Sequence, residues 1–351
     1  MKPRSAQGRR RVLSLAIQRF DRTAALHTRI VTIEDVMVLQ VLPGVGVRGL
    51  LNGTFDAAEI PMALYAFLRD RGAPFTGVPV FPDRIFVQQY VYIRPDTGIR
   101  SPADLRGRRV CVPLYFMTAS LWHRGLLKDE HGILPQEIEW TTTTPEWEGS
   151  EIPKDVRVSL KRGPHLGLEA LLDGTVDCLM TEAAPIVPQD QRDRVTRLHP
   201  DVHALQREWF GRTRCHPSVH VIAVRQAVAE ERPELLEELC DAFDRAKQSA
   251  YYLLQNERMT GLPLMRTHLD ETAALFGEDP WPYGVEGRNR AEIDRFLGYA
   301  FDQGLTRRRL APEGLFDQPA RDFAFRARMV EGADLGGLDS LLGYLPDGGQ
   351  G

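Results

Sequence analysis

Short apolar runs, each bounded by polar or glycine-containing segments, mark the N-terminal part of the chain. The first, Val12–Ile17, has the length and composition of a buried strand. The charged loop Phe20-Asp21-Arg22-Thr23 follows it directly. Similar runs occur at Val36–Leu42, Phe55–Ile60, Val78–Pro82 and Tyr90–Ile93. Because open α/β sheets bind ligands at the carboxyl ends of their strands, this pattern predicts a ligand site along one sheet edge.

A second α/β segment is predicted to begin after Gly98. Pro102 is a helix-start signal and Gly107 a helix stop, and Arg109–Val112 is a new strand. A helix is expected from Thr118, placed as its N-cap, and its backbone N–H groups would form an anion site. Later elements are a helix over Leu166–Leu172, strands over Val176–Met180 and Val219–Val224, and a helix from Pro233 with Leu235, Leu236, Leu239, Phe243 and Ala246 on one face.

Length and composition fit this two-part organisation. A chain of 351 residues exceeds what one hydrophobic core usually serves, so two domains are expected. Apolar residues make up 43% and charged residues 26%, the balance of a globular protein. The net charge of -4 argues against nucleic acid as a partner and favours a small molecule. The one dense basic run is interpreted as a solvated tail and comprises Lys2, Arg4, Arg9, Arg10 and Arg11.

The same sequence predicts where the protein works. Val12–Ile17 is too short for the apolar core of a signal peptide, and no apolar run approaches the roughly 20 residues that span a bilayer. We therefore expect a cytoplasmic protein without a membrane partner. The four cysteines are widely spaced and are expected to be reduced and mostly buried; they are Cys111, Cys178, Cys215 and Cys240.

Several motifs occur together in an order and at spacings typical of one family. They are Phe20-Asp21-Arg22-Thr23, Val80-Phe81-Pro82-x-Arg84, Ser101-Pro102-Ala103-Asp104-Leu105-x-Gly107-Arg108, Tyr115-x-x-Thr118-Ala119, Pro217-x-x-His220-Val221 and Trp281-Pro282-Tyr283-Gly284-Val285-Glu286. As a set, from about Val12 to about Phe316, they resemble the 4,5-dihydroxyphthalate decarboxylase family. Each motif alone is weak, and their combination is specific.

The resemblance implies an α/β fold of the two-lobed type II periplasmic-binding-protein kind, with a ligand cleft between the lobes. The crossing segments are expected near Arg94–Gly98 and Val221–Arg225. Lobe one would comprise residues 1–96 and 222–351, and lobe two residues 97–221. The implied function is a cofactor-independent decarboxylase, or a related lyase, acting on a small aromatic or conjugated carboxylic acid. A non-catalytic carboxylate-binding protein or sensor on the same fold is the alternative.

Departures from the family pattern change the expected ligand. Ala183 stands where the family has an arginine, Pro61 and Ala63 replace serines, and Val87 and Gln88 replace a basic pair. Each replacement removes a donor for a second carboxylate or a phenol oxygen. The pocket is therefore expected to favour one carboxylate over two.

Charged residues at strand ends are the main catalytic candidates. Arg22 is expected to hold a substrate carboxylate, with Asp21 positioning it or moving a proton. His220 and Glu59 are the candidate proton donors. The alternative for Asp21 and Arg22 is an ion pair that shapes the loop. The alternative for His220 is a buried, structural histidine.

Further residues are expected to contact the substrate. These are Arg84, Tyr115, Thr118, Glu182, Trp281 and Tyr283. An ion pair explains Arg84 nearly as well, and a plain helix N-cap explains Thr118. Packing between the lobes is the alternative for the two aromatic residues near position 282.

A metal site is the remaining possibility, because histidines and one cysteine lie close together in the sequence. They are His199, His203, Cys215, His216 and His220. Pro200 and Pro217 make it doubtful that the histidine pairs share one face of a helix. We therefore expect no metal and no cofactor.

Overall fold

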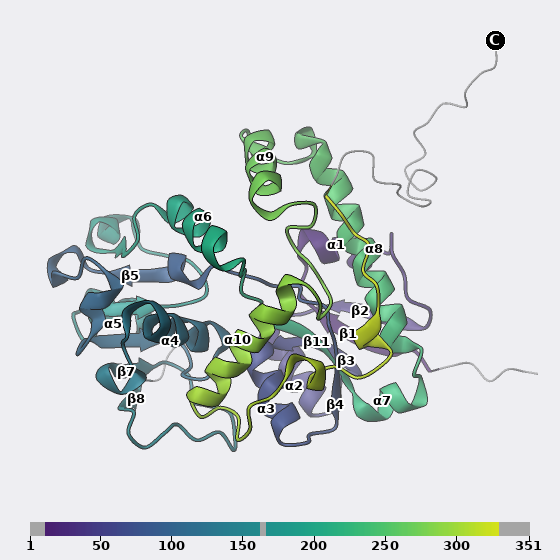
Figure 1. The fold of residues 1–351 in the computed structure, drawn as a ribbon, viewed down its shortest axis with the longest axis horizontal. Helices are drawn as coiled ribbons and strands as arrows, with labels where there is room; N and C mark the ends of the chain where they lie inside the picture. The colour runs from purple at the N-terminus through teal and green to yellow at the C-terminus, as the bar shows by residue number, and fades with distance from the viewer. Residues whose placement is uncertain (1–10, 162–165, 330–351) are drawn as a thin grey trace, which may run out of the picture.

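Two mixed β-sheets, one in each of two neighbouring lobes, organise the structure (Figure 1). The computed structural model describes residues 11–161 and 166–329. The first sheet contains β1 (Leu13–Ile17), β2 (Val36–Gln40), β3 (Ala57–Pro61), β4 (Phe75–Val78) and β11 (His220–Arg225), in the order β2-β1-β3-β11-β4. The second contains β5 (Val91–Ile93), β6 (Arg109–Val112), β7 (Glu139–Thr142), β8 (Val158–Leu160), β9 (Cys178–Met180) and β10 (Thr196–Arg197), in the order β10-β5-β9-β6-β7-β8.

Helices pack on both sheets. The first lobe carries α1 (Asp21–His27), α2 (Pro43–Leu51), α3 (Met62–Asp70), α7 (Gln226–Glu231) and α8 (Leu235–Gln255). The second carries α4 (Thr118–His131), α5 (Leu166–Leu172) and α6 (Val202–Thr213), and α9 (Met265–Phe276) and α10 (Arg288–Asp302) follow α8 in the chain. One buried apolar cluster contains both Leu15 of β1 and Val110 of β6, so a continuous core joins the lobes.

The direction of β11 brings distant parts of the chain together. Strands β1, β2 and β3 run parallel, whereas β11 runs antiparallel to its neighbours β3 and β4. In this register His220, the first residue of β11, lies opposite Pro61, the last residue of β3. The carboxyl ends of β1 and β3 and the start of β11 therefore meet at one edge of the first sheet.

The two-lobed α/β architecture expected from the sequence is confirmed, with local differences. Pro102–Leu105 forms a single 3-10 turn and not a longer helix, and the stop falls at Gly107, whose φ is 74°. Thr118 is the first residue of α4, and the N-cap is Met117.

The chain changes sheets between β4 and β5 and again between β10 and β11. Both changes come before the predicted crossings near Arg94–Gly98 and Val221–Arg225. The division of residues 1–96 and 222–351 from 97–221 therefore assigns β5 and the start of β11 to the lobe whose sheet they do not join. Residues 330–351, and the basic run before Arg11, lie outside the described residues.

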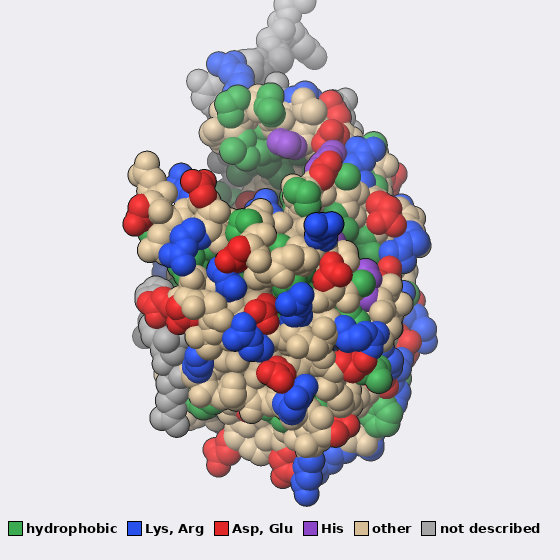
Figure 2. All heavy atoms as spheres, turned by 90° about the vertical axis from the view of Figure 1, so that its left-hand side faces the viewer, with side chains coloured by type: hydrophobic (Ala, Val, Ile, Leu, Met, Phe, Trp, Pro, Cys, Tyr) green, Lys and Arg blue, Asp and Glu red, His purple; other side chains and the backbone are tan. Residues whose placement is uncertain are grey.

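Surface charge is mixed on the outer face of the second lobe. In Figure 2, Lys and Arg side chains alternate there with Asp and Glu, without a continuous basic area on the described part of this face. In residues 11–161 and 166–329, no helix has both the length and the apolar character needed to cross a membrane.

Candidate active site

His220 and Glu59 form a close pair at this sheet edge. Nδ1 of His220 lies 2.6 Å from Oε1 of Glu59. The two residues occupy diagonal positions on the same face of the β3–β11 ladder, where side chains reach one another. Within the part of the chain that the structure describes, Nε2 of the imidazole has no hydrogen-bond partner, so it is the ring nitrogen left for a ligand.

Glu59 is held ionised by several donors. Its side chain is 2% exposed and accepts hydrogen bonds from the backbone N–H and the side-chain amide of Gln18, both at 2.9 Å. Burial opposes ionisation, but the hydrogen bond and charge of His220 and the Gln18 bonds outweigh it and lower the pKa of Glu59. Gln18 follows β1 directly, so its role depends on the β1–β3 pairing.

The imidazole of His220 is held in its charged form by neighbouring carboxylates. Burial alone would lower its pKa. The hydrogen bond and charge of Glu59, together with the charges of Asp83 and Glu182, reverse this effect and raise the pKa of His220 above its ordinary 6.5. The imidazolium is therefore the favoured state near neutral pH.

Asp83 is a second carboxylate beside His220 that was not predicted from the sequence. Its Oδ2 lies 3.8 Å from Nδ1 of His220. It is the variable position of the motif Val80-Phe81-Pro82-x-Arg84, directly after a strand-like run. The rule that selected Asp21, a charge following a strand, would also have selected Asp83.

Arg22 lies on the same side of the first lobe and is fixed by aromatic rings. Its guanidinium stacks over Trp281 at 3.8 Å and over Phe20 at 4.3 Å from the ring centroids. Nε donates to the Pro82 carbonyl at 2.5 Å, and NH1 donates to Asp21 at 2.9 Å. Asp21 is exposed and holds Arg22, and among the described residues no contact joins it to His220. NH2 of Arg22 has no partner there and remains for an anion.

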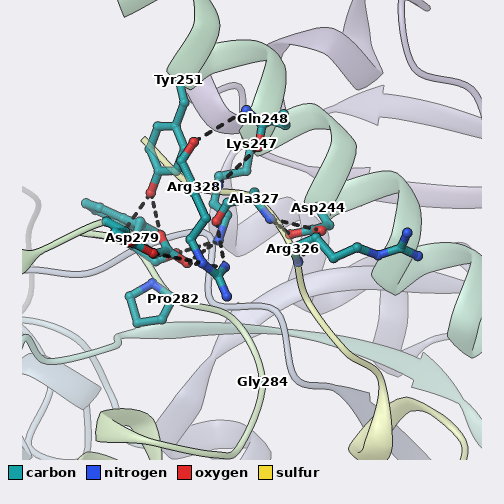
Figure 3. A network of polar contacts seen from close by, with 12 residues as sticks. Asp244, Lys247, Gln248, Tyr251, Asp279, Pro282, Gly284, Arg326, Ala327 and Arg328 are labelled. Carbon is teal, nitrogen blue, oxygen red and sulfur yellow. Dashed lines mark hydrogen bonds and ion pairs between the residues drawn. The ribbon is translucent and has the colours of Figure 1, made fainter. Parts of the chain in front are cut away.

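A buried polar network holds the loop that carries Trp281. Lys247 of α8 is fully buried and donates to Asp279 at 2.9 Å and to the Trp281 carbonyl at 3.0 Å. Figure 3 shows Lys247, Tyr251 and Arg328 converging on Asp279. Lys247 also lies 4.3 Å from the ring centroid of Tyr283, which is buried. Tyr283 thus packs inside the loop and does not line an open surface.

The second lobe contributes an open groove at the carboxyl ends of β6, β7 and β9. Its volume is about 720 Å³. The lining residues include Pro113, Thr143, Thr181, Glu182 and Ala183. The groove approaches His220 at Glu182, whose charge contributes to the raised pKa of that histidine.

Arg84 is engaged inside the protein. Its side chain is 1% exposed, and it donates to Glu292 at 2.6 Å and to Asn289 at 2.7 Å. The carbonyls of His216 and Pro282 accept two further bonds, at 2.7 and 2.8 Å. The guanidinium of Arg84 is therefore held by these partners inside the protein and not beside His220.

Tyr115 and Thr118 are also buried. The Tyr115 ring packs under the guanidinium of Arg124 at 3.6 Å. Oγ1 of Thr118 accepts the backbone N–H of Ala63 at 3.1 Å, which ties α4 to the first lobe. The backbone N–H groups of Tyr115 and Phe116, just before α4, are occupied by the carboxylate of Glu146 at 2.6 and 3.1 Å.

The histidines of the metal hypothesis are dispersed. His216 is stacked on Phe86 at 4.5 Å, and burial lowers its pKa well below the ordinary value. His203 pairs with Glu271 at 3.2 Å, and His199 lines a separate cavity of about 160 Å³ between α4 and α6. The described residues contain no group of three or more His, Cys, Asp or Glu side chains placed to hold a metal ion.

The fold defines the class of protein first. The structure is similar to the crystal structure of the periplasmic aliphatic sulphonate binding protein SsuA from Escherichia coli, with a TM-score of 0.51, 15% identity, and coverage of 92% of this chain and 97% of that chain. The chain is thus a two-lobed protein of the periplasmic-binding-protein-like fold.

Sequence comparison then gives the family. No family model matches the chain. It is 32% identical over 321 residues to 4,5-dihydroxyphthalate decarboxylase from Comamonas testosteroni, covering 87% of this chain and 96% of that protein. It is 28% identical over 208 residues to the protein of the same name from Pseudomonas putida, covering 56% of this chain and 81% of that protein. The chain belongs to the 4,5-dihydroxyphthalate decarboxylase family.

Proposed function

We propose that the protein is a decarboxylase of a small aromatic carboxylic acid and that His220 is its proton donor. The observation that carries the proposal is the His220–Glu59 pair, in which Glu59 holds Nδ1 and leaves Nε2 for the substrate. The relatives named 4,5-dihydroxyphthalate decarboxylase support the reaction class. The cytoplasmic location remains part of this proposal.

The reaction requires one proton and no redox partner. Nε2–H of His220 protonates the ring carbon that bears the carboxylate. The bond from that carbon to the carboxylate then breaks, its electron pair returns to the ring, and carbon dioxide leaves. His220 regains a proton from solvent. Arg22 binds the substrate carboxylate through its free NH2 group and the charge of its guanidinium, which positions the acid for proton transfer.

Glu59 acts in this proposal as a positioning residue and not as the acid. Its lowered pKa keeps it ionised, and its side chain is 2% exposed, so it neither carries a proton nor reaches a ligand. Its charge stabilises the imidazolium and fixes the ring orientation.

A non-catalytic carboxylate-binding protein is the second candidate, because the fold is similar to that of a binding protein. It would use the same Arg22 contact but would bind acids without consuming them. Product formation therefore separates the two candidates.

The test is carbon dioxide release from hydroxylated benzoic and phthalic acids, run in deuterium oxide. We expect the wild-type protein to place deuterium on the carbon that lost the carboxylate. His220→Ala should lower kcat by about 100-fold or more with ligand binding retained. Tight binding of these acids without carbon dioxide release would favour the binding-protein function.

Glu59→Gln is the matched variant. His220 is active when protonated, so kcat/KM should fall as pH rises through its pKa, which lies above 6.5. Removing the Glu59 charge lowers that pKa, and the basic limb of the profile should move to lower pH. An unmoved limb would show that His220 is not the group that titrates.

A further inference from the structure

Two carboxylates flank His220, and their side chains differ in exposure. The Asp83 side chain is 26% exposed, whereas that of Glu59 is 2% exposed. Asp83 is held in place by its backbone, because its carbonyl accepts the N–H of Val219 at 2.9 Å and Arg84 pairs with Ser218 in an antiparallel bridge. The carboxylate of Asp83 is thus held beside His220 and stays partly exposed to solvent.

Charged and titratable groups surround Asp83 from four elements. His220 and Arg22 favour its ionised form, and Glu59 opposes it. Burial raises the pKa of Tyr90, which lies just before β5, and the charge of Asp83 adds to this effect. Burial is the largest influence and raises the pKa of Asp83 above its ordinary 3.8, which makes the carboxylate a better proton acceptor than an exposed aspartate.

We propose that Asp83 is the base that accepts the proton of a ring hydroxyl while His220 protonates the ring. This inference rests on the proposed decarboxylase function and deepens it, because it names a second catalytic residue at the same site. Asp83 can assist acids that carry a hydroxyl ortho or para to the carbon bearing the carboxylate. Asp83 is a catalytic residue in this scheme, since it contacts the reacting hydroxyl.

The chemistry explains why a second group is needed. Protonating a ring carbon breaks aromaticity and leaves positive charge on the ring. If the hydroxyl O–H bond breaks and its proton moves to Asp83, the intermediate is a ketone-like ring without that charge. When carbon dioxide leaves, the electron pair restores the aromatic ring and generates a phenolate, which takes the proton back from Asp83. Only hydroxyls ortho or para to the protonated carbon sit on ring positions that share this positive charge.

The experiment compares wild type, Asp83→Asn and Asp83→Glu on 4-hydroxybenzoate, 3,4-dihydroxybenzoate and 3-hydroxybenzoate. Asp83→Asn should lower kcat for the two para-hydroxylated acids by about 100-fold or more, with a smaller change in KM. Wild type should discriminate against the meta isomer, which Asp83 cannot assist. Asp241→Asn, on the exposed face of α8, is the matched control and should behave as wild type.

The pH profile gives a readout that a structural role would not move. Asp83 acts as a base when ionised, so activity should fall as pH drops through its raised pKa. This acidic limb should vanish in Asp83→Asn and persist in Asp83→Glu. On 4-hydroxy-3-nitrobenzoate, whose hydroxyl is already ionised at neutral pH, the ratio of variant to wild-type kcat should return toward one.

The outcomes separate the two proposals. If wild type releases carbon dioxide and Asp83→Asn keeps both its rate and its acidic limb, the role of Asp83 is refuted and the decarboxylase function stands. If Asp83→Asn is poorly folded, loss of the limb in Asp83→Glu counts equally against the proposal. If wild type binds every acid of the panel and releases carbon dioxide from none, both proposals fail together.

Discussion

His220 lies between two carboxylates whose surroundings assign them different proton affinities. Glu59 receives hydrogen bonds from Gln18 and His220, and its pKa is lowered. Asp83 has fewer donors, and burial raises its pKa. The sequence placed His220 and Glu59 at strand ends, but it could not show which of them carries the proton. That distinction depends on Gln18, which approaches from another strand.

Substrate charge is tested at position 183. Ala183 lines the groove of the second lobe, whereas Ala63 and Val87 are fully buried and do not open to it. Of the five replaced positions, Ala183 is the one that lines this groove, so the prediction is tested there. Ala183→Arg adds a planar fork of donors and should strengthen binding of phthalate-type diacids relative to monoacids by about 10-fold, measured by calorimetry.

Ala227→Arg on α7 adds the same charge away from the groove and is the control for it. An unchanged preference in Ala183→Arg would show that position 183 does not face the ligand. Tighter binding of diacids than of matched monoacids by the wild type would contradict the single-carboxylate expectation itself.

At the scale of elements, apolar runs predicted the strands more fully than the helices. β1, β2 and β6 fall where short apolar runs placed them, and β1 and β6 are largely buried whereas β2 is a partly exposed edge strand. Helices α9 and α10 were not predicted as separate elements. The position of β11 was expected, but its antiparallel insertion between β3 and β4 was not, since pairing depends on contacts distant in sequence.

Helix α8 supports the site through Lys247, and removing this side chain should destabilise the protein. Lys247→Met leaves Asp279 without its ammonium partner in a buried network. Breaking a buried ion pair from one side costs about 3–5 kcal/mol of unfolding free energy, which urea denaturation would measure. The loop that carries Trp281 should also loosen. Because Arg22 stacks on Trp281, its guanidinium would then be less well positioned for the substrate, and KM should rise.

Arg245→Met is the control on the exposed face of the same helix. Its ion pair with Asp241 is exposed, so the unfolding free energy should change by less than about 1 kcal/mol. Equal effects of the two substitutions would show that the buried network contributes no more than a surface pair.

For the whole molecule, α10 connects the lobes, because it packs against α4 of the second lobe and α3 of the first. Trp122 packs edge-on against Tyr299 at 5.4 Å, and Tyr299 donates to Asp129. Arg124 donates to Gln303 at 2.7 Å, immediately after α10. Aromatic packing and buried hydrogen bonds of this kind stabilise one arrangement of the lobes without a ligand.

This contact predicts that the lobes stay together when the site is empty. Binding proteins of this architecture close around their ligands by hinge motion, so their radius of gyration falls on binding. Here small-angle X-ray scattering should give the same radius with and without a bound aromatic acid. At Gly125 of α4, an added Cβ would lie 2.3 Å from the Tyr299 ring, so Gly125→Val should separate α4 from α10 and increase the radius. A ligand-dependent decrease in the wild type would instead show lobes that open, as a transport receptor requires. If the radius is constant, the cleft is preformed, and substrate acids meet His220, Asp83 and Arg22 already in position.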